Sequence, residues 1–304
     1  MEQGQLFGLL GENGAGKTTA IRMFVTTLLP TSGVGRVGGY DVVNEPQRVR
    51  EIIGLVSSEE RSFYWRLTGR QNLDFFAALH HLSPRAARHR IDELLEVVDV
   101  RDEADQPFHS YSTGTRHKFS IARGLLTDPQ VLFLDEPTRS LDPIAASEVR
   151  HLISERIVRQ MGRSALLATH SLAEAEAICD RVAIIRAGRL VATGTVADLR
   201  AQMGLTTLCE IRIRGAPEGT PDELARLPGV QAVAPLVDGK ATRLELRLEQ
   251  GGAALDGVLR YLLAGGAVVE SCQTREPTLE EIYRRALEIG PESEAPQLTP
   301  EFPA

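Results

Sequence analysis

Several features that would assign this chain to a familiar class of protein are missing from its sequence. Its three cysteines are far apart, so they form neither an even disulfide framework nor a C-x-x-C metal-binding spacing. No apolar run approaches the ~20 residues needed to span a bilayer, and the first residues lack the pattern of a signal peptide. The net charge is -7 at pH 7, and no cluster of lysine or arginine suits nucleic acid or an anionic membrane surface. We therefore expect a cytoplasmic protein that does not bind nucleic acid and that meets a membrane only through a protein partner.

The sequence pattern divides the 304 residues into two folded regions and a tail. Up to about Gly204, short apolar runs alternate with helical segments, which is typical of an α/β fold with a largely parallel sheet. After Gly204 the order of elements becomes β-α-β-β-α-β, which predicts a small α+β domain of the ferredoxin-like type. From Gly290 the chain is acidic and rich in proline, as disordered tails are. We expect domains at residues 1–204 and 205–289, and a disordered tail at residues 290–304.

A glycine-rich stretch near the start of the chain has the composition of a phosphate-binding loop. The sequence GENGAGKTT, residues 11–19, follows the apolar run LFGLL and precedes a segment with helical spacing of apolar residues. Glycines let backbone N–H groups converge on phosphate oxygens, and the helix N-terminus adds partial positive charge. Lys17 would reach the β- and γ-phosphates of a nucleotide, and the hydroxyl of Thr18 would reach a Mg²⁺ ion. The residues expected to bind the nucleotide here are Gly11, Glu12, Asn13, Gly14, Ala15, Gly16, Lys17, Thr18 and Thr19.

Two apolar strands further along the chain end in polar residues. VLFLD is followed by Glu136, and SALLATH ends in His170. Because parallel strands bind ligands at their carboxyl ends, Asp135, Glu136 and His170 should lie at the same sheet edge as the glycine loop. Asp135 suits the coordination of Mg²⁺, and Glu136 suits the polarisation of a water that attacks the γ-phosphate. A helix should begin directly after His170, where Ser171 and Glu174 fit a capping box.

In this order the motifs resemble those of the ATP-binding cassette (ABC) ATPases over roughly residues 1–200. The glycine loop resembles the family's Walker A motif, LDEP resembles Walker B, and His170 matches the switch histidine. The resemblance implies a P-loop NTPase fold with ATP and Mg²⁺ as cofactors. It also implies ATP hydrolysis with Glu136 and His170 as the catalytic residues.

The family's signature motif and D-loop also have counterparts in this chain. YSTGT resembles the LSGGQ signature, with Thr113 and Thr115 in place of the usual glycine and glutamine. It keeps Ser112 and Gly114, the two positions with which the family touches the γ-phosphate. The SLD that ends in Asp142 resembles the D-loop. Because the signature completes the ATP site of the opposite subunit in this family, one cassette per chain implies a head-to-tail dimer with a second copy of the chain.

Two further stretches, LTGRQNL and PTLEEIY, resemble the ATPase subunits of exporters of the daunorubicin-resistance type. The resemblance implies that the chain powers export of a drug, antibiotic, lipid or polysaccharide through a separate membrane permease. It would then lie at the inner face of the cell membrane, held there by the permease. The alternatives are a soluble ABC ATPase without a transport role and a nucleotide-gated regulator. The first would usually carry two cassettes or a coiled-coil insertion, and the second would be expected to lack the Walker B glutamate or the switch histidine.

The region between the glycine loop and the signature departs from the family pattern. The glutamine with which the family coordinates Mg²⁺ is absent, and either Glu59 or Ser58 takes its place, depending on the alignment. We favour Glu59 as a metal ligand because a carboxylate also coordinates a hard cation. The aromatic residues Phe63, Tyr64 and Trp65 follow at once, and they are either anchors for the permease or packing residues of the helical part of the fold.

The N-terminus is a second departure. Relatives place an outer pair of strands and an aromatic residue that stacks on adenine before Walker A, whereas MEQGQLF leads directly into the inner strand here. We expect that the fold given by this sequence lacks those N-terminal strands because the true start codon lies upstream of Met1. The alternative is a shortened cassette that holds ATP mainly by its phosphates.

Overall fold

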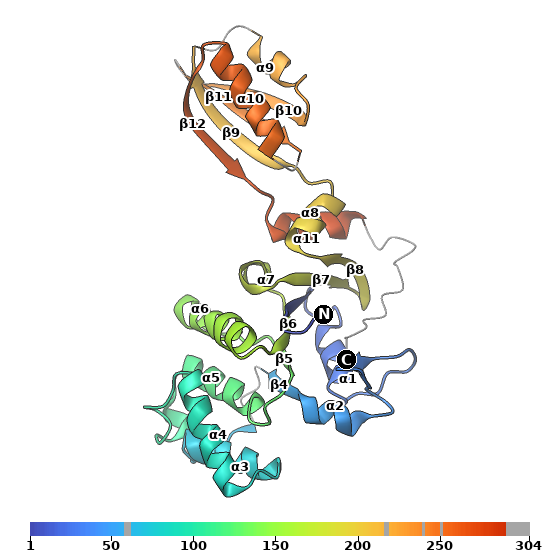
Figure 1. The fold of residues 1–304 in the computed structure, drawn as a ribbon, viewed down its shortest axis with the longest axis vertical. Coiled ribbons are helices and arrows are strands. Elements are labelled where there is room, and N and C mark those ends of the chain that lie inside the picture. Colours follow the sequence, from blue (N-terminus) through green and yellow to red (C-terminus); the bar gives the residue numbers. More distant parts are fainter. Residues whose placement is uncertain (58–61, 216–218, 239–240, 250–251, 290–304) are drawn as a thin grey trace. The chain divides into compact units, whose positions relative to one another are not determined.

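A six-stranded sheet forms the centre of the first part of the chain (Figure 1). The computed structural model describes residues 1–57, 62–215, 219–238, 241–249 and 252–289. Neighbouring strands of the sheet pair in parallel, except that the last strand pairs antiparallel with β7. From edge to edge the strands are β4 (Ile53–Ser57), β5 (Val131–Asp135), β6 (Ser164–Thr169), β1 (Leu6–Leu10), β7 (Arg181–Arg186) and β8 (Arg189–Gly194). The predicted α/β fold with a largely parallel sheet is confirmed.

The sheet is covered on both faces, because its central strands are apolar at consecutive positions. Along β5, Val131 and Phe133 face one core cluster, which includes residues of α1 (Lys17–Phe24) and α2 (Pro46–Ile52). Leu132 and Leu134 face the other cluster, which includes residues of α5 (Thr113–Gly124) and α6 (Pro143–His151). The helix α6 continues as a π-helical segment, Leu152–Gln160. A further helix, α7 (Leu172–Ile178), follows β6, and a short hairpin is formed by β2 (Arg36–Val37) and β3 (Tyr40–Asp41).

Three helices pack together beside β4, the edge strand of the sheet, into a helical layer: α3 (Gly69–Leu79), α4 (Pro84–Val97) and α5, which also contacts the sheet. Helix α3 begins at a complete capping box, in which Thr68 and Gln71 exchange side-chain to backbone hydrogen bonds. A short 3₁₀ helix, Phe108–Ser110, leads toward α5, and the ring of Phe108 is fully buried among other aromatic rings. This helical layer includes the aromatic residues that follow Ser58 and Glu59 in the sequence.

The second part of the chain has the predicted β-α-β-β-α-β order. All strand pairs are antiparallel, and the strand order is β10-β11-β9-β12. Alternate strand residues such as Ile211 and Leu246 are fully buried with apolar residues of α9 and α10. The elements, in chain order, are α8 (Val196–Gln202), β9 (Thr207–Arg214), α9 (Thr220–Leu224), β10 (Val230–Asp238), β11 (Ala241–Leu248), α10 (Gly252–Ala264), β12 (Val268–Arg275) and α11 (Leu279–Ile289). The predicted ferredoxin-like fold is therefore confirmed.

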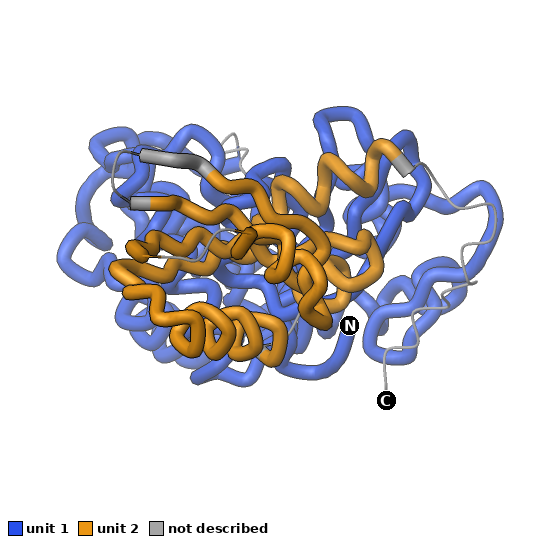
Figure 2. Tube along the Cα trace, turned by 90° about the horizontal axis from the view of Figure 1, so that it is seen from above, with its two compact units in different colours: residues 1–195, 290–304 blue, residues 196–289 orange. Residues whose placement is uncertain are grey.

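The chain separates into two compact units, Met1–Thr195 and Val196–Ile289 (Figure 2). The division falls before α8, whereas the sequence pattern placed it after Gly204. Helix α8 belongs to the second unit because Arg200 donates to the backbone oxygen of Pro277 at 2.7 Å and pairs with Glu276. The predicted tail, residues 290–304, lies outside the described residues. Within the described ranges, every helix is too short or too polar to cross a bilayer.

Candidate active site

The glycine loop lies between β1 and α1, and its conformation requires glycine at specific positions. Gly16 caps α1 in the left-handed region, with φ of 110°. A side chain on Gly11 would place Cβ only 2.5 Å from the backbone oxygen of Ile185 and 2.9 Å from the Cβ of Ala15. The loop is therefore packed directly against the end of β7, and it leads into the first turn of α1.

One contact that holds the loop was not predicted from the sequence. The backbone N–H of Gly188 donates to the oxygen of Ala15 at 2.8 Å, from the turn between β7 and β8. Both residues of that turn, Ala187 and Gly188, have positive φ. The pair Ala-Gly between two apolar runs is a recognisable hairpin signal, but the signal gives no information about which loop the turn contacts.

Lys17 is a buried cation at the mouth of the loop, only 5% exposed. Its Nζ donates to the backbone oxygens of Gly11 at 2.7 Å and Glu12 at 3.1 Å. An ammonium group has three N–H donors, so one is left after these two bonds. The nearest acidic atom is Oε1 of Glu136 at 3.8 Å, which is an ion pair beyond hydrogen-bond distance. The site thus holds a positive charge with a donor available for an anion.

Thr18 and Asp135, the two predicted Mg²⁺ ligands among the described residues, contact each other near Lys17. The hydroxyl of Thr18 donates to Oδ1 of Asp135 at 3.3 Å, which joins the first turn of α1 to the end of β5. Burial raises the pKa of Asp135, and the Thr18 hydrogen bond and the Lys17 charge oppose that rise. A hydroxyl and a carboxylate fit Mg²⁺, which binds few protein oxygens and keeps several waters or phosphate oxygens. The third predicted ligand, Glu59, lies outside the described residues, as does its alternative Ser58.

Glu136 and His170 face each other across the ends of two neighbouring strands. Nδ1 of His170 lies 2.6 Å from Oε2 of Glu136. The side chain of Glu136 is 13% exposed and that of His170 is 50% exposed, so solvent reaches the pair from the histidine side. Glu136 has a positive φ of 54°, and its backbone N–H donates to Ala168 of β6 at 2.9 Å. This uncommon backbone conformation aims the carboxylate at both Lys17 and His170.

The signature residues have local roles within this chain. Ser112 caps α5, since its Oγ accepts from the backbone N–H of Thr115 at 3.1 Å and lies 2.8 Å from the hydroxyl of Thr115. A Cβ on Gly114 would lie 3.2 Å from the Cβ of Ala145, the third residue of α6. Asp142 caps α6 by accepting from the backbone N–H groups of its first turn. Across the described ranges, no hydrogen bond or ion pair joins these three predicted ligands to the glycine loop.

The three adjacent aromatic residues have different environments. Phe63 is 4% exposed and stacks on Phe108 with 4.4 Å between ring centroids, so it is a packing residue. Tyr64 and Trp65 are 50% and 45% exposed. The Tyr64 ring contacts the edge of Phe75 on α3, with the centroids 4.9 Å apart. The packing alternative therefore holds for Phe63, whereas Tyr64 and Trp65 remain predicted anchors.

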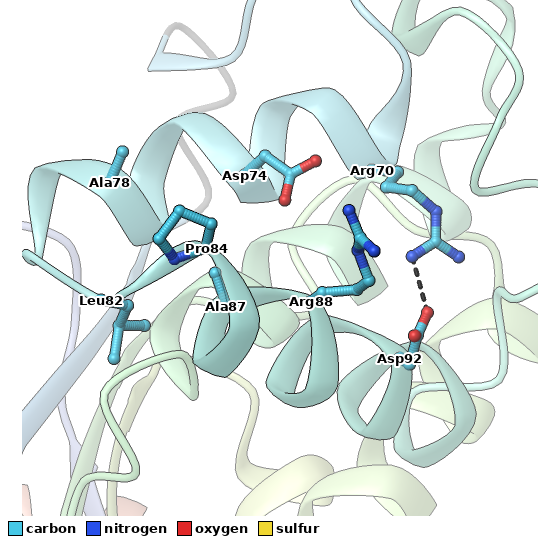
Figure 3. A pocket seen from close by; sticks show the side chains of 8 residues that line it. All are labelled: Arg70, Asp74, Ala78, Leu82, Pro84, Ala87, Arg88 and Asp92. Carbon is cyan, nitrogen blue, oxygen red and sulfur yellow. Dashed lines mark hydrogen bonds and ion pairs between the residues drawn. The ribbon is translucent and has the colours of Figure 1, made fainter.

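A groove between α3 and α4 lies in the same helical layer (Figure 3). Arg70 of α3 forms an ion pair with Asp92 of α4 at 2.6 Å across it, while Asp74 and Arg88 project into it from the same two helices. The groove has a volume of about 640 Å³ and shares no residue with the glycine loop. Its lining consists of Arg70, Asp74, Ala78, Leu82, Pro84, Ala87, Arg88 and Asp92.

Comparisons with known proteins extend over almost the whole chain. A family model described as "ABC transporter" matches residues 1–139, and one described as "ATP-binding protein DrrA1-3-like, C-terminal domain" matches residues 194–287. The chain is 40% identical to the daunorubicin resistance ATP-binding protein DrrA3 of Streptomyces coeruleorubidus, over 92% of this chain and 86% of that protein. It is 31% identical to the linearmycin resistance ATP-binding protein LnrL of Bacillus subtilis, over 93% of this chain and 89% of that protein. Among solved structures, cbiO1 from Clostridium perfringens, part of the ABC transporter complex cbiONQ, is similar with a TM-score of 0.61 and 30% identity, over 66% of this chain and 80% of that one.

Proposed function

Because the chain belongs to the ABC transporter family, as an ATP-binding subunit of the daunorubicin-resistance type, we propose how its own residues bind and hydrolyse ATP. The predicted activity is confirmed at the level of the family: the chain is the ATP-hydrolysing subunit of an export system that works with a separate membrane permease. The comparisons give no support to a non-transport ATPase or a regulator. The observation that carries the proposal for the site is the contact of Glu136 with His170 beside the buried Lys17.

Binding of the phosphates is assigned to residues 11–19. The backbone amides at the start of α1 and the free N–H of Lys17 all present positive charge to one place, which suits the β- and γ-phosphates. Thr18 and Asp135 would hold Mg²⁺, which neutralises charge on the phosphates when it is bound. Asp135 must be ionised to do so, although its burial favours the protonated form. Glu59 remains the predicted third ligand.

Glu136 is assigned as the general base. One carboxylate oxygen, Oε2, is occupied by His170, and Oε1 lies 3.8 Å from Nζ of Lys17, on the side where the phosphates bind. Oε1 would accept a proton from water as the water oxygen bonds to the γ-phosphorus. The bond from that phosphorus to the β–γ bridging oxygen then breaks, and ADP and phosphate are released. His170 fixes the carboxylate in this orientation and is reached by solvent, so it can relay the proton outward.

We assign to a second copy of the chain the residues that complete the ATP site. Ser112 is exposed at the N-terminus of α5, where the helix presents partial positive charge. Ile144, the second residue of α6, is 75% exposed, which is unusual for an isoleucine of a stable fold. These features support a head-to-tail dimer in which Ser112, Gly114 and Asp142 of one copy face the nucleotide of the other.

We assign the docking site for the permease to the exposed apolar side chains of the helical layer. Tyr64, Trp65, Phe75 and Leu79 are 50%, 45%, 36% and 59% exposed, respectively. Large aromatic residues of this kind are typical anchors of protein interfaces. The α3–α4 groove, with its paired acidic and basic side chains, borders the same helix and would orient the partner (Figure 3). Docking of the permease here would hold the chain at the inner face of the membrane.

The substitution Glu136→Gln tests the proposed function. The glutamine keeps the size and the hydrogen bond to His170 but cannot accept the proton, so turnover should fall by ~10² or more while ATP binding stays near normal. The variant should also form an ATP-dependent dimer that is visible by gel filtration. Lys17→Ala is the matched control, because it should weaken ATP binding itself. Normal ATPase activity in Glu136→Gln would refute the assignment of the base.

A further inference from the structure

Glu174 is a buried carboxylate whose contacts do not match its place in the sequence. It is only 2% exposed, and it lies in the first turn of α7, four residues after His170. As the last member of a capping box, its side chain would turn back to the backbone N–H of Ser171. Only half of that box forms: Ser171 accepts from the backbone N–H of Glu174 at 3.3 Å, and the Glu174 side chain points elsewhere.

The carboxylate of Glu174 instead accepts a hydrogen bond from Thr138. The hydroxyl of Thr138 donates to Oε1 at 2.7 Å, and the other oxygen, Oε2, is buried without a hydrogen-bond partner in the part of the chain that the structure describes. Burial of a carboxylate with a single neutral donor destabilises a fold. An apolar residue of the same size would serve the core of α7 better, so stability does not account for a glutamate here.

Thr138 lies in the turn that carries Glu136. Both Glu136 and Ser140, on either side of it, have positive φ, at 54° and 64°. Such non-glycine residues are strained and keep their conformation only when surrounding contacts hold them. The bond from Thr138 to Glu174 is one such contact, and it connects this turn to the helix that begins right after His170.

We propose that Thr138 and Glu174 form a brace that positions Glu136 against His170. Two side-chain contacts then join the turn after β5 to the segment after β6: Glu136 to His170 takes part in the reaction, and the part-buried bond from Thr138 to Glu174 of α7 sets the separation of the two segments. The inference rests on the proposed roles of Glu136 and His170. Thr138 and Glu174 are positioning residues, since neither is placed at the nucleotide.

The test uses three variants of the full chain that break the bond: Thr138→Val, Glu174→Met and the double variant with both substitutions. Thr138→Ser is the control, and each variant is measured by steady-state ATPase kinetics and thermal unfolding. Thr138→Val removes only the hydroxyl, whereas Thr138→Ser keeps it. We expect kcat to fall about 10-fold in the first three variants with KM for ATP nearly unchanged, and to stay close to the wild-type value in Thr138→Ser. The double variant should lose no more activity than either single variant, because all three break the same bond.

The double variant separates positioning from stability. It replaces both partners by apolar side chains of similar size, so its melting temperature should equal or exceed that of the wild type while kcat remains low. Wild-type kcat in the double variant would overturn the proposal, as would a Thr138→Ser variant as slow as Thr138→Val. The assignment of Glu136 as the general base has a separate test, because only normal ATPase activity in Glu136→Gln would refute it.

Discussion

Replacement of Trp65 by alanine should weaken permease binding much more than it weakens the fold. The side chain of Trp65 is 45% exposed, and its inner side has two described ring contacts: the edge of Phe108 at 6.3 Å and the guanidinium of Arg116 at 4.5 Å above the ring. Phe63, two residues earlier, is 4% exposed and stacks on the same Phe108 ring. The two neighbouring aromatic residues therefore form a matched pair for mutation, one half-exposed and one buried.

The two ring contacts of Trp65 indicate the size of its contribution to stability. An exposed cation–π contact contributes about 0.5–1 kcal/mol, and an aromatic edge contact about 0.5–1.5 kcal/mol. Trp65→Ala should therefore lower the free energy of unfolding by about 1–2.5 kcal/mol, whereas Phe63→Ala should lower it by about 3–5 kcal/mol, as for other buried phenylalanines. A tryptophan that anchors an interface contributes about 2–4 kcal/mol to binding, which is roughly a 30- to 1,000-fold change in Kd.

Two measurements on each variant distinguish an interface role from a core role for Trp65. Urea unfolding followed by circular dichroism gives the free energy of unfolding, and co-purification with the co-expressed permease from solubilised membranes gives binding. Trp65→Ala should abolish co-purification and leave the ATPase activity of the isolated chain unchanged, and Trp65→Phe should retain part of the binding. A loss of 3 kcal/mol or more of stability in Trp65→Ala would show that Trp65 is a core residue and refute the argument.

Three further predictions concern the glycine loop, the metal ligand and the second unit. Gly11→Ala should abolish binding of a fluorescent ATP analogue, because its Cβ would lie 2.5 Å from the backbone oxygen of Ile185. The control variant Gly257→Ala, which has open space around the added Cβ, should bind the analogue normally. Because burial raises the pKa of Asp135, protons should compete with Mg²⁺ there, so the Mg²⁺ concentration for half-maximal ATPase activity should rise as the pH is lowered; a pH-independent Mg²⁺ requirement would contradict this. A side-chain hydrogen bond from Arg275, together with the backbone N–H of Thr278, lowers the pKa of Glu281 from 4.5 to about 2, so its stabilisation is complete above pH 4.5 and lost as the pH falls through 2. Glu281→Gln should therefore lower the melting temperature at neutral pH and leave it unchanged at pH 2, and equal shifts at both values would exclude the charge as the cause.

The parts of the site that are continuous in sequence could be predicted without the structure. Loop conformation, helix start and strand burial all depend on residues within a few positions of one another, which is why GENGAGKTT and the strand end at Asp135 were recognisable. The rule that parallel strands present their carboxyl ends at one edge also placed Glu136 near His170, and the structure brings them to 2.6 Å. The catalytic and binding roles of these residues stay predictions.

Contacts between distant segments were decided only by the tertiary structure. Composition cannot distinguish Phe63 from Trp65, because both rings contact Phe108 and only the folded helical layer buries Phe63 in a stacked contact and leaves Trp65 half-exposed. The pattern at Ser171 predicted a complete capping box, which was wrong for the Glu174 side chain because a hydroxyl from another loop offers that carboxylate a buried partner. A local motif specifies which bonds a side chain can make, and the packing of the whole unit decides which of them it makes.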